Sequence, residues 1–159
     1  CGLAIAIFVS RQLSKSFAVD LLLTSGHELG MCGGYHLAQN YNAKPKCVLH
    51  LGSCIANIDA KTTAICSTNS VTAGHIASAL KRLGIKLVNL SDPTNKENWV
   101  GESMCWVSNN WPILSIAGLA PHFHARSDLP EVVTNPGLLG TAIEVIMDSI
   151  LALANQGKT

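Results

Sequence analysis

The sequence predicts an α/β fold, built as a three-layer sandwich with a mainly parallel central sheet. Short apolar runs rich in β-branched residues alternate with stretches of helical periodicity, which is typical of strands linked by helices. The strands are nearly continuous apolar runs, which is typical of a sheet covered on both faces. With 159 residues, 48% of them apolar and 13% charged, the chain has the length and composition of one domain spanning 1–159.

The first part of the chain predicts two helices and two strands. Residues 2–15 are apolar over most of a helical face and predict a buried helix. The run Ala18-Val19-Asp20-Leu21-Leu22-Leu23 predicts a buried strand over 18–24. A helix over 26–41 follows, and Asn40, Asn42 and Pro45 end it. The apolar run at 46–52 predicts the second strand.

The second part continues the alternation. Residues 62–67 are rich in β-branched side chains and predict the third strand, and 71–83 form an amphipathic helix that Gly84 closes. Residues 85–90 predict the fourth strand. The polar, mixed stretch 91–110 predicts a loop with helical turns, and 112–118 the fifth strand. A loop over 121–135 then leads to a long terminal helix over 136–155.

Composition excludes several kinds of partner. The net charge is +1 and the chain has neither a basic run nor an acidic tail, so we expect no binding to nucleic acid or to a membrane surface. The apolar stretch 2–9 is too short to span a bilayer. The six cysteines form no C-x-x-C pair, and several lie inside apolar runs. This pattern predicts reduced, buried thiols and a cytoplasmic location.

Chemically active side chains stand at or just past the ends of predicted strands. The carboxyl ends of parallel strands share one edge of a sheet, so we expect these side chains to converge there. Histidine and glutamate are zinc ligands in hydrolases, where three protein ligands leave one position open for water. The set consists of His27, Glu28, His50, Glu102, His122 and His124.

These residues also have structural interpretations. Ser25 followed by Glu28 forms a capping box, which starts a helix without any catalysis. His50 lies inside an apolar strand, where a histidine is more often a hydrogen-bonded core residue than a ligand. Asp128 could cap or brace its loop.

A side-chain nucleophile is the weaker alternative. No G-x-S-x-G elbow surrounds Ser25 or Ser53. Cys54 lies four residues after His50, but nothing in its surroundings favours a lowered thiol pKa.

The order of two motifs resembles a known family. The first motif is Thr24-Ser25-Gly26-His27-Glu28-Leu29-Gly30-Met31-Cys32-Gly33-Gly34, and the second is Phe123-His124-Ala125-Arg126-Ser127-Asp128-Leu129-Pro130-Glu131. With the apolar helix that starts at Gly2, they resemble the co-catalytic zinc aminopeptidases of the bacterial leucyl aminopeptidase type, which have the glutaminyl cyclases as relatives. The resemblance covers nearly the whole chain and implies a zinc-exopeptidase-like fold.

The resemblance also implies roles for individual residues. By position, His27 falls on the general base, which is a glutamate in the family, and Glu28 falls on a zinc ligand. His50 falls on a ligand that is an aspartate in the family, and His124 falls on the last ligand, a histidine. The periphery of the site then consists of Glu102, His122 and Asp128.

The family's first two ligands, a histidine and the bridging aspartate, precede the helix at Gly2. The resemblance therefore implies a C-terminal portion that lacks the family's first strands and cannot complete a two-zinc centre. Glu28, His50 and His124 could still hold a single zinc, with His27 as the base. We expect the metal-free state to be favoured over this zinc site, and little or no aminopeptidase activity from this chain.

Two functions stay open. The first is an aminopeptidase-like, metal-dependent hydrolase acting on a small peptide or amide substrate, impaired or inactive as this chain. The second is a non-catalytic binding or structural relative of the same fold. The absent strands also predict an uncovered sheet edge, and therefore a homo-oligomer, most simply a homodimer.

Overall fold

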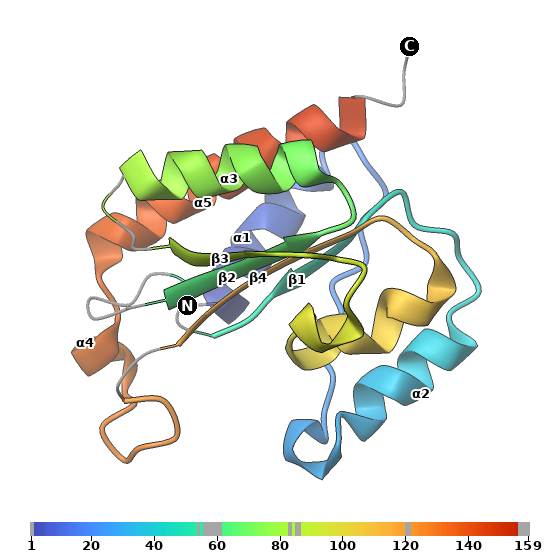
Figure 1. The fold of residues 1–159 in the computed structure, drawn as a ribbon, viewed down its shortest axis with the longest axis horizontal. Helices are drawn as coiled ribbons and strands as arrows, with labels where there is room; N and C mark the ends of the chain where they lie inside the picture. The colour runs from blue at the N-terminus through green and yellow to red at the C-terminus, as the bar shows by residue number, and fades with distance from the viewer. Residues whose placement is uncertain are drawn as a thin grey trace.

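The computed structural model describes residues 2–53, 55, 62–82, 84, 87–119 and 122–155 of the chain. Helices and strands alternate through these ranges, as Figure 1 shows, and the predicted α/β class is confirmed. In chain order the elements are α1 (Gly2–Leu13), η1 (His27–Leu29), α2 (Cys32–Asn40), β1 (Val48–Leu51), β2 (Thr62–Ser67), α3 (Ser70–Arg82), β3 (Leu87–Ser91), η2 (Lys96–Asn98), η3 (Gly101–Asn109), β4 (Ile113–Leu119), α4 (Pro130–Val133) and α5 (Pro136–Asn155), where η marks a 3-10 helix.

Among the described residues the sheet is mixed: two of its strand pairings are parallel, as expected, and one is antiparallel. Its four strands lie in the order β1-β4-β2-β3; β1 pairs with β4 and β2 with β3 in parallel, while β2 pairs with β4 antiparallel. The reason lies in the connection from β3 to β4. Because η2 and η3 stay at one end of the sheet instead of crossing it, β4 returns antiparallel to β2. The carboxyl ends of β1 and β4 therefore lie opposite those of β2 and β3, and the expectation of one shared edge is wrong.

Helices cover both faces of the sheet, and side-chain alternation along the strands produces two cores. Leu114 and Ile116 of β4 point to the face covered by α1, α3 and α5, where they pack against Ile5 and Ile146. Ile113 points to the opposite face, where the tryptophan-rich core lies against α2 and η3. In Figure 1, α3 and α5 lie on one side of the sheet and α2 on the other.

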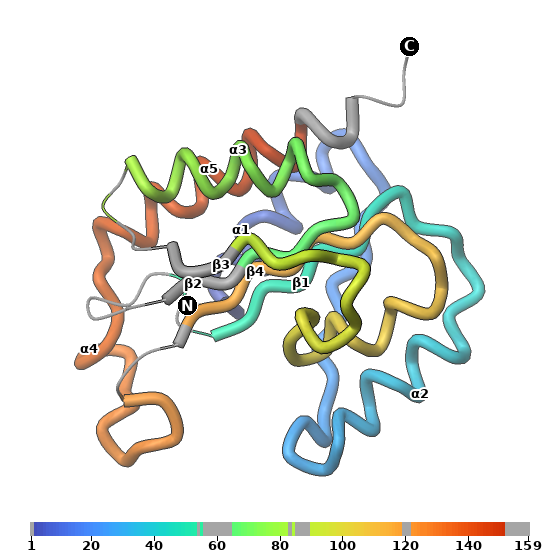
Figure 2. Tube along the Cα trace, viewed as in Figure 1, coloured from blue at the N-terminus to red at the C-terminus, as the bar shows by residue number. Residues whose placement is uncertain are grey.

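The buried strand predicted over 18–24 is wrong. The chain is extended there but pairs with no strand of the described residues, and the side chains of Leu21, Leu22 and Leu23 are 42%, 40% and 69% exposed. A run of leucines is buried as a strand only where a neighbouring strand and a covering helix accept it. Figure 2 follows this segment, in blue, from the end of α1 to η1.

The helix predicted over 26–41 is divided into η1 and α2. Gly30 and Met31 adopt left-handed backbone angles, with φ of 72° and 57°, and these angles end the first turn before α2 starts. Tyr41, just after α2, donates a hydrogen bond from its hydroxyl to Asp20 and so ties the extended segment to the helix. The left-handed backbone angles of Gly30 and Met31 change the direction of the chain between His27 and α2.

The helices α1, α3 and α5 follow their predicted bounds closely, whereas α4 lies within the stretch 121–135 predicted as a loop. α5 covers the predicted range, and the predicted loop at 91–110 contains η2 and η3. α1 is amphipathic rather than fully buried, because Ile5 and Val9 face the core while Leu3, Ile7 and Phe8 are exposed. Among the helices that the structure describes, none has the length and apolar character needed to cross a bilayer.

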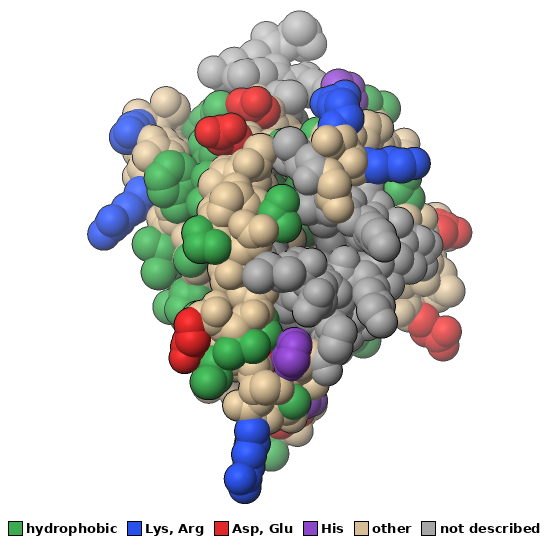
Figure 3. Space-filling view, turned by 90° about the vertical axis from the view of Figure 1, so that its left-hand side faces the viewer, with side chains coloured by type: hydrophobic (Ala, Val, Ile, Leu, Met, Phe, Trp, Pro, Cys, Tyr) green, Lys and Arg blue, Asp and Glu red, His purple; other side chains and the backbone are tan. Residues whose placement is uncertain are grey.

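The cysteine side chains of the described residues are free thiols that differ in exposure. Cys32, Cys47, Cys66 and Cys105 are free; Cys66 and Cys105 are buried as predicted, whereas Cys32 is exposed, contrary to the prediction. Cys1 and Cys54 lie outside the described residues. On the face shown in Figure 3, acidic, basic and hydrophobic side chains are interspersed, and no single sign of charge covers the described part of that face.

Candidate functional site

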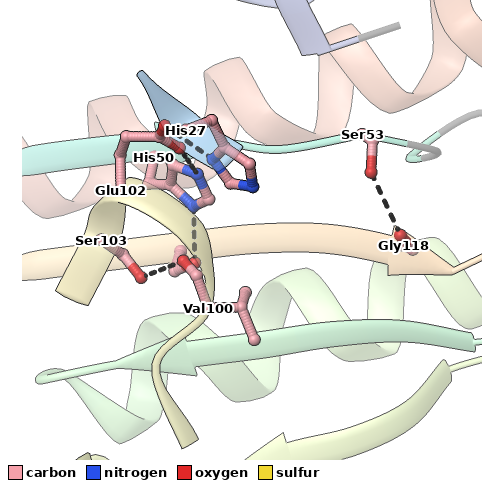
Figure 4. Close-up of polar contacts among 8 residues, drawn as sticks. His27, His50, Ser53, Val100, Glu102, Ser103 and Gly118 are labelled. Carbon is pink, nitrogen blue, oxygen red and sulfur yellow. Dashed lines mark hydrogen bonds and ion pairs between the residues drawn. The ribbon is translucent and has the colours of Figure 1, made fainter. Parts of the chain in front are cut away.

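The carboxylate of Glu102 lies between two histidine rings. Nδ1 of His27 donates a hydrogen bond to Oε1 of Glu102 over 2.8 Å, and Nε2 of His50 lies 3.8 Å from Oε2. The three residues come from η1, β1 and η3, which are far apart in the sequence (Figure 4). Glu102, expected only at the periphery of a site, is therefore the residue that joins His27 to His50.

Glycines make room for this arrangement. Gly101 has a φ of 54°, and a Cβ atom on it would lie 3.2 Å from Nε2 of His50 and 3.7 Å from Cε1 of His27. A Cβ atom on Gly34 of α2 would lie 2.9 Å from Sγ of Cys105 in η3 and 3.4 Å from Cγ of Glu102. The start of η3 can approach both histidine rings and α2 because these two positions carry no side chain.

A buried serine fixes the second histidine. Ser115 of β4 pairs in register with His50 of β1, so both side chains leave the same face of the sheet. Nδ1 of His50 and Oγ of Ser115 lie 2.9 Å apart, and Ser115 is 1% exposed. The hydroxyl can donate or accept, so the bond suits either tautomer of the ring. With Nδ1 bound to Ser115, the other ring nitrogen faces Glu102.

The surroundings of the two histidines shift their pKa values in opposite directions. The hydrogen bond to Glu102, followed by the charge of that carboxylate, raises the pKa of His27 against a small effect of burial, and Glu28 adds to the rise. Burial lowers the pKa of His50, and the charge of Glu102 only partly offsets it. Near neutral pH, His50 is thus held neutral while His27 is the ring poised to gain a proton.

Glu102 itself stays ionised. Burial raises the pKa of its carboxyl group, but the hydrogen bonds from His27 and from its own backbone amide, together with the charges of both imidazoles, outweigh burial and leave the pKa below its usual range. An ionised carboxylate on Nδ1 of His27 places the exchangeable proton of that ring at Nε2. The side chain of His27 is 52% exposed, so solvent reaches this ring.

The other predicted residues form a separate, exposed pair. Nε2 of His124 lies 3.5 Å from Oε1 of Glu28. His124 adopts a φ of 65°, and its ring stacks on Phe123 with the ring centres 4.1 Å apart. His122 bonds to Oγ of Ser127 over 2.8 Å within the same loop. The loop thus meets η1 through the contact between His124 and Glu28.

The remaining predicted residue, Asp128, and the alternative nucleophile Ser53 are not part of either group. The backbone amide of Asp128 donates to Ala125, so this residue belongs to a turn of the loop. Oγ of Ser53 donates to the carbonyl of Gly118 over 3.5 Å, away from the histidines in Figure 4. Cys54 is outside the described residues.

The structure divides the predicted zinc ligands between these two groups. Glu28 and His124 contact each other, whereas both ring nitrogens of His50 are directed to other partners. In the described ranges, no three or more His, Cys, Asp and Glu side chains surround a point where a metal ion could be held. The single-zinc site stays a prediction.

The array of His27, His50 and Glu102 depends on two further residues, Ser115 and Gly101, that could not be named from the sequence. The sequence does mark Ser115 as unusual, because it is a polar residue inside the apolar run Ile113-Leu114-Ser115-Ile116, just as His50 is inside its own strand. Only the register of β1 against β4 shows that the two polar residues face each other. Gly101 left no signal beyond its position before Glu102.

No protein-family model matches the chain, and no curated protein or solved structure matches it either. The resemblance to zinc aminopeptidases therefore rests on the two sequence motifs alone.

Proposed function

We propose that this chain carries an aminopeptidase-like hydrolytic site for small peptides or amides, in which His27 is the acid–base residue and Glu102 orients it. The observation that carries the proposal is the 2.8 Å bond between Nδ1 of His27 and Oε1 of Glu102, on a ring that solvent reaches. A histidine oriented in this way by a carboxylate is a common general base. The zinc-exopeptidase-like fold is part of the proposal, and the order of the two motifs supports it.

The proposed reaction moves one proton on and off His27. Neutral His27 holds its proton on Nδ1, donated to Glu102, and accepts a proton from water on Nε2. The water oxygen attacks the amide carbonyl as that proton leaves. The imidazolium is stabilised by Glu102, and its Nε2 proton passes to the departing amine, which restores neutral His27. No side-chain nucleophile is required.

Activity should be low. General acid–base catalysis by one residue contributes on the order of 10²–10⁴-fold. The larger contribution in amide hydrolysis usually comes from groups that stabilise the oxyanion. The resemblance assigns that part to metal ions, and within the described residues no group of three or more ligand side chains surrounds a common point. The contact between Glu28 and His124 joins two donor types that zinc accepts, so zinc belongs in the test as a separate arm.

A non-catalytic role is the second candidate, and one feature favours it. Glu102 bridges η1 and β1 through two histidines, which by itself ties together elements far apart in the sequence. Such a cross-link could have a purely structural purpose. Turnover separates the two candidates, because a structural cross-link gives none.

A second copy of the chain is the proposed partner. β1 is an end strand of the sheet, and Leu21, Leu22 and Leu23 are exposed. An open strand edge and exposed leucines both favour pairing with another chain. A cytoplasmic setting also belongs to the proposal, supported by the four free thiols among the described residues.

The test is hydrolysis of leucyl chromogenic amides by the purified chain, with EDTA and with added zinc. His27→Gln should abolish turnover, and Glu102→Gln should lower it without abolishing it. His36→Gln, an exposed histidine of α2 outside the array, is the matched control and should leave the rate unchanged. A rate that survives His27→Gln, or no turnover under any condition, would overturn the proposal in favour of the structural role.

A further inference from the structure

A hollow of about 490 Å³ opens beside η2 and η3, away from the array around Glu102. It lies on the face of the sheet covered by the tryptophan-rich core, next to the yellow and gold helices of Figure 1. Side chains that line it include Lys96, Trp99, Val107, Asn110, Trp111 and Ile113. Its size falls in the range of roughly 300–1,000 Å³ that small-molecule sites occupy.

The aromatic wall of the hollow is held in place. The ring of Trp111 packs on Trp106, with centres 5.7 Å apart, and edge-on against Tyr41 at 6.0 Å. Trp99 is buried, and its indole N–H donates to the carbonyl of Pro93 over 3.0 Å. Since these contacts fix both indoles, the wall offers a preformed apolar surface on which a planar ring can stack.

The polar rim of the hollow carries one cationic side chain, that of Lys96. Neither Asp nor Glu lines the hollow, and Lys96 makes no ion pair with any residue that the structure describes. The carboxylate of Asp92, which is not among the lining residues, accepts hydrogen bonds from the backbone amide and the hydroxyl of Thr94 at 2.9 Å and 2.8 Å. Asn110, at a φ of 55°, adds an exposed side-chain amide to the rim. An aromatic wall beside a cation selects a ligand that is both planar and anionic.

We propose that this hollow binds a small aromatic carboxylate. Its ring stacks on Trp111, and its carboxylate meets the ammonium group of Lys96 and the amide of Asn110. This site is independent of the hydrolytic site, because it shares no residue with the array of His27, His50 and Glu102.

Calorimetric titration of the full chain with 1-naphthoate at low ionic strength tests the proposal. We expect a dissociation constant below about 1 mM, and binding at least tenfold weaker for the neutral 1-naphthalenemethanol. Lys96→Gln should erase that difference between the two ligands. Lys81→Gln, an exposed lysine in the last turn of α3, is the matched control and should preserve it.

A second variant covers the aromatic wall. Trp111→Phe keeps a ring in the core but removes part of the stacking surface, so it should weaken 1-naphthoate and 1-naphthalenemethanol alike while leaving their ratio intact. Absence of binding, equal affinity for the acid and the alcohol, or a preference that persists in Lys96→Gln would each overturn the proposal.

Discussion

The position of Gly101 can be tested by adding one methyl group. Gly101→Ala places an L side chain at a φ of 54°, which costs about 1–2 kcal/mol in the left-handed region. The new Cβ atom would also lie 3.2 Å from Nε2 of His50, closer than ordinary contact, and His50 is only 14% exposed. Overpacking of this kind costs on the order of 1–3 kcal/mol. We therefore expect Gly101→Ala to lower the free energy of unfolding by about 2–5 kcal/mol.

Gly84 provides the matched control. It has a φ of 79°, and a Cβ atom there would have no described neighbour within 4 Å. Gly84→Ala should therefore cost only the backbone part, about 1–2 kcal/mol. Urea unfolding of both variants measures the difference. Removing the ring with His50→Ala should reduce the cost of Gly101→Ala to that of the control. Equal costs of the two alanines in the wild-type background, within about 0.5 kcal/mol, would refute the close approach of η3 to His50.

Three further expectations concern pH, thiols and association. Because Glu102 raises the pKa of His27, the stabilisation from this pair is complete below a pH of about 6.5 and is lost as pH rises through the folded-state pKa. The destabilisation caused by Glu102→Gln should therefore be larger at pH ~6, where Glu102 is still ionised, than at high pH, and a pH-independent difference would count against the pair. Burial raises the pKa of Cys47 and Cys66 to about 11, so only about one thiol in a thousand is ionised near pH 8. Mass spectrometry after brief alkylation should find the exposed Cys32 modified well before either; comparable rates would show that the two thiols are not shielded. Light scattering at a protein concentration on the order of tens of micromolar should show a dimer, and a monomer would contradict the pairing proposed for β1.

Local signals in the sequence were sufficient for most elements. Pro136 opens α5, and a continuous helical pattern carries it to Asn155, as predicted. The β-branched run at 62–67 forms β2 with the predicted bounds. These elements could be predicted because the residues that specify them lie within them.

Long-range relations could not be predicted in the same way. Whether Leu21–Leu23 pair as a strand depends on neighbours that the run itself does not specify. The direction of β4 depends on whether η2 and η3 cross the sheet, and helical periodicity carries no information on this. The array around Glu102 depends on both, because its residues meet through the placement of η3 on the sheet rather than at one shared edge.

The pH dependence of amide hydrolysis tests the central role of His27 and Glu102 most directly. If His27 is the base, the rate should rise with pH as its ring loses a proton. The midpoint of this rise should lie above the ordinary imidazole pKa, because Glu102 raises the pKa of His27. In Glu102→Gln the rising limb should move to lower pH while the maximum rate falls. A limb that stays in place in Glu102→Gln, or that persists in His27→Gln, would contradict the assignment.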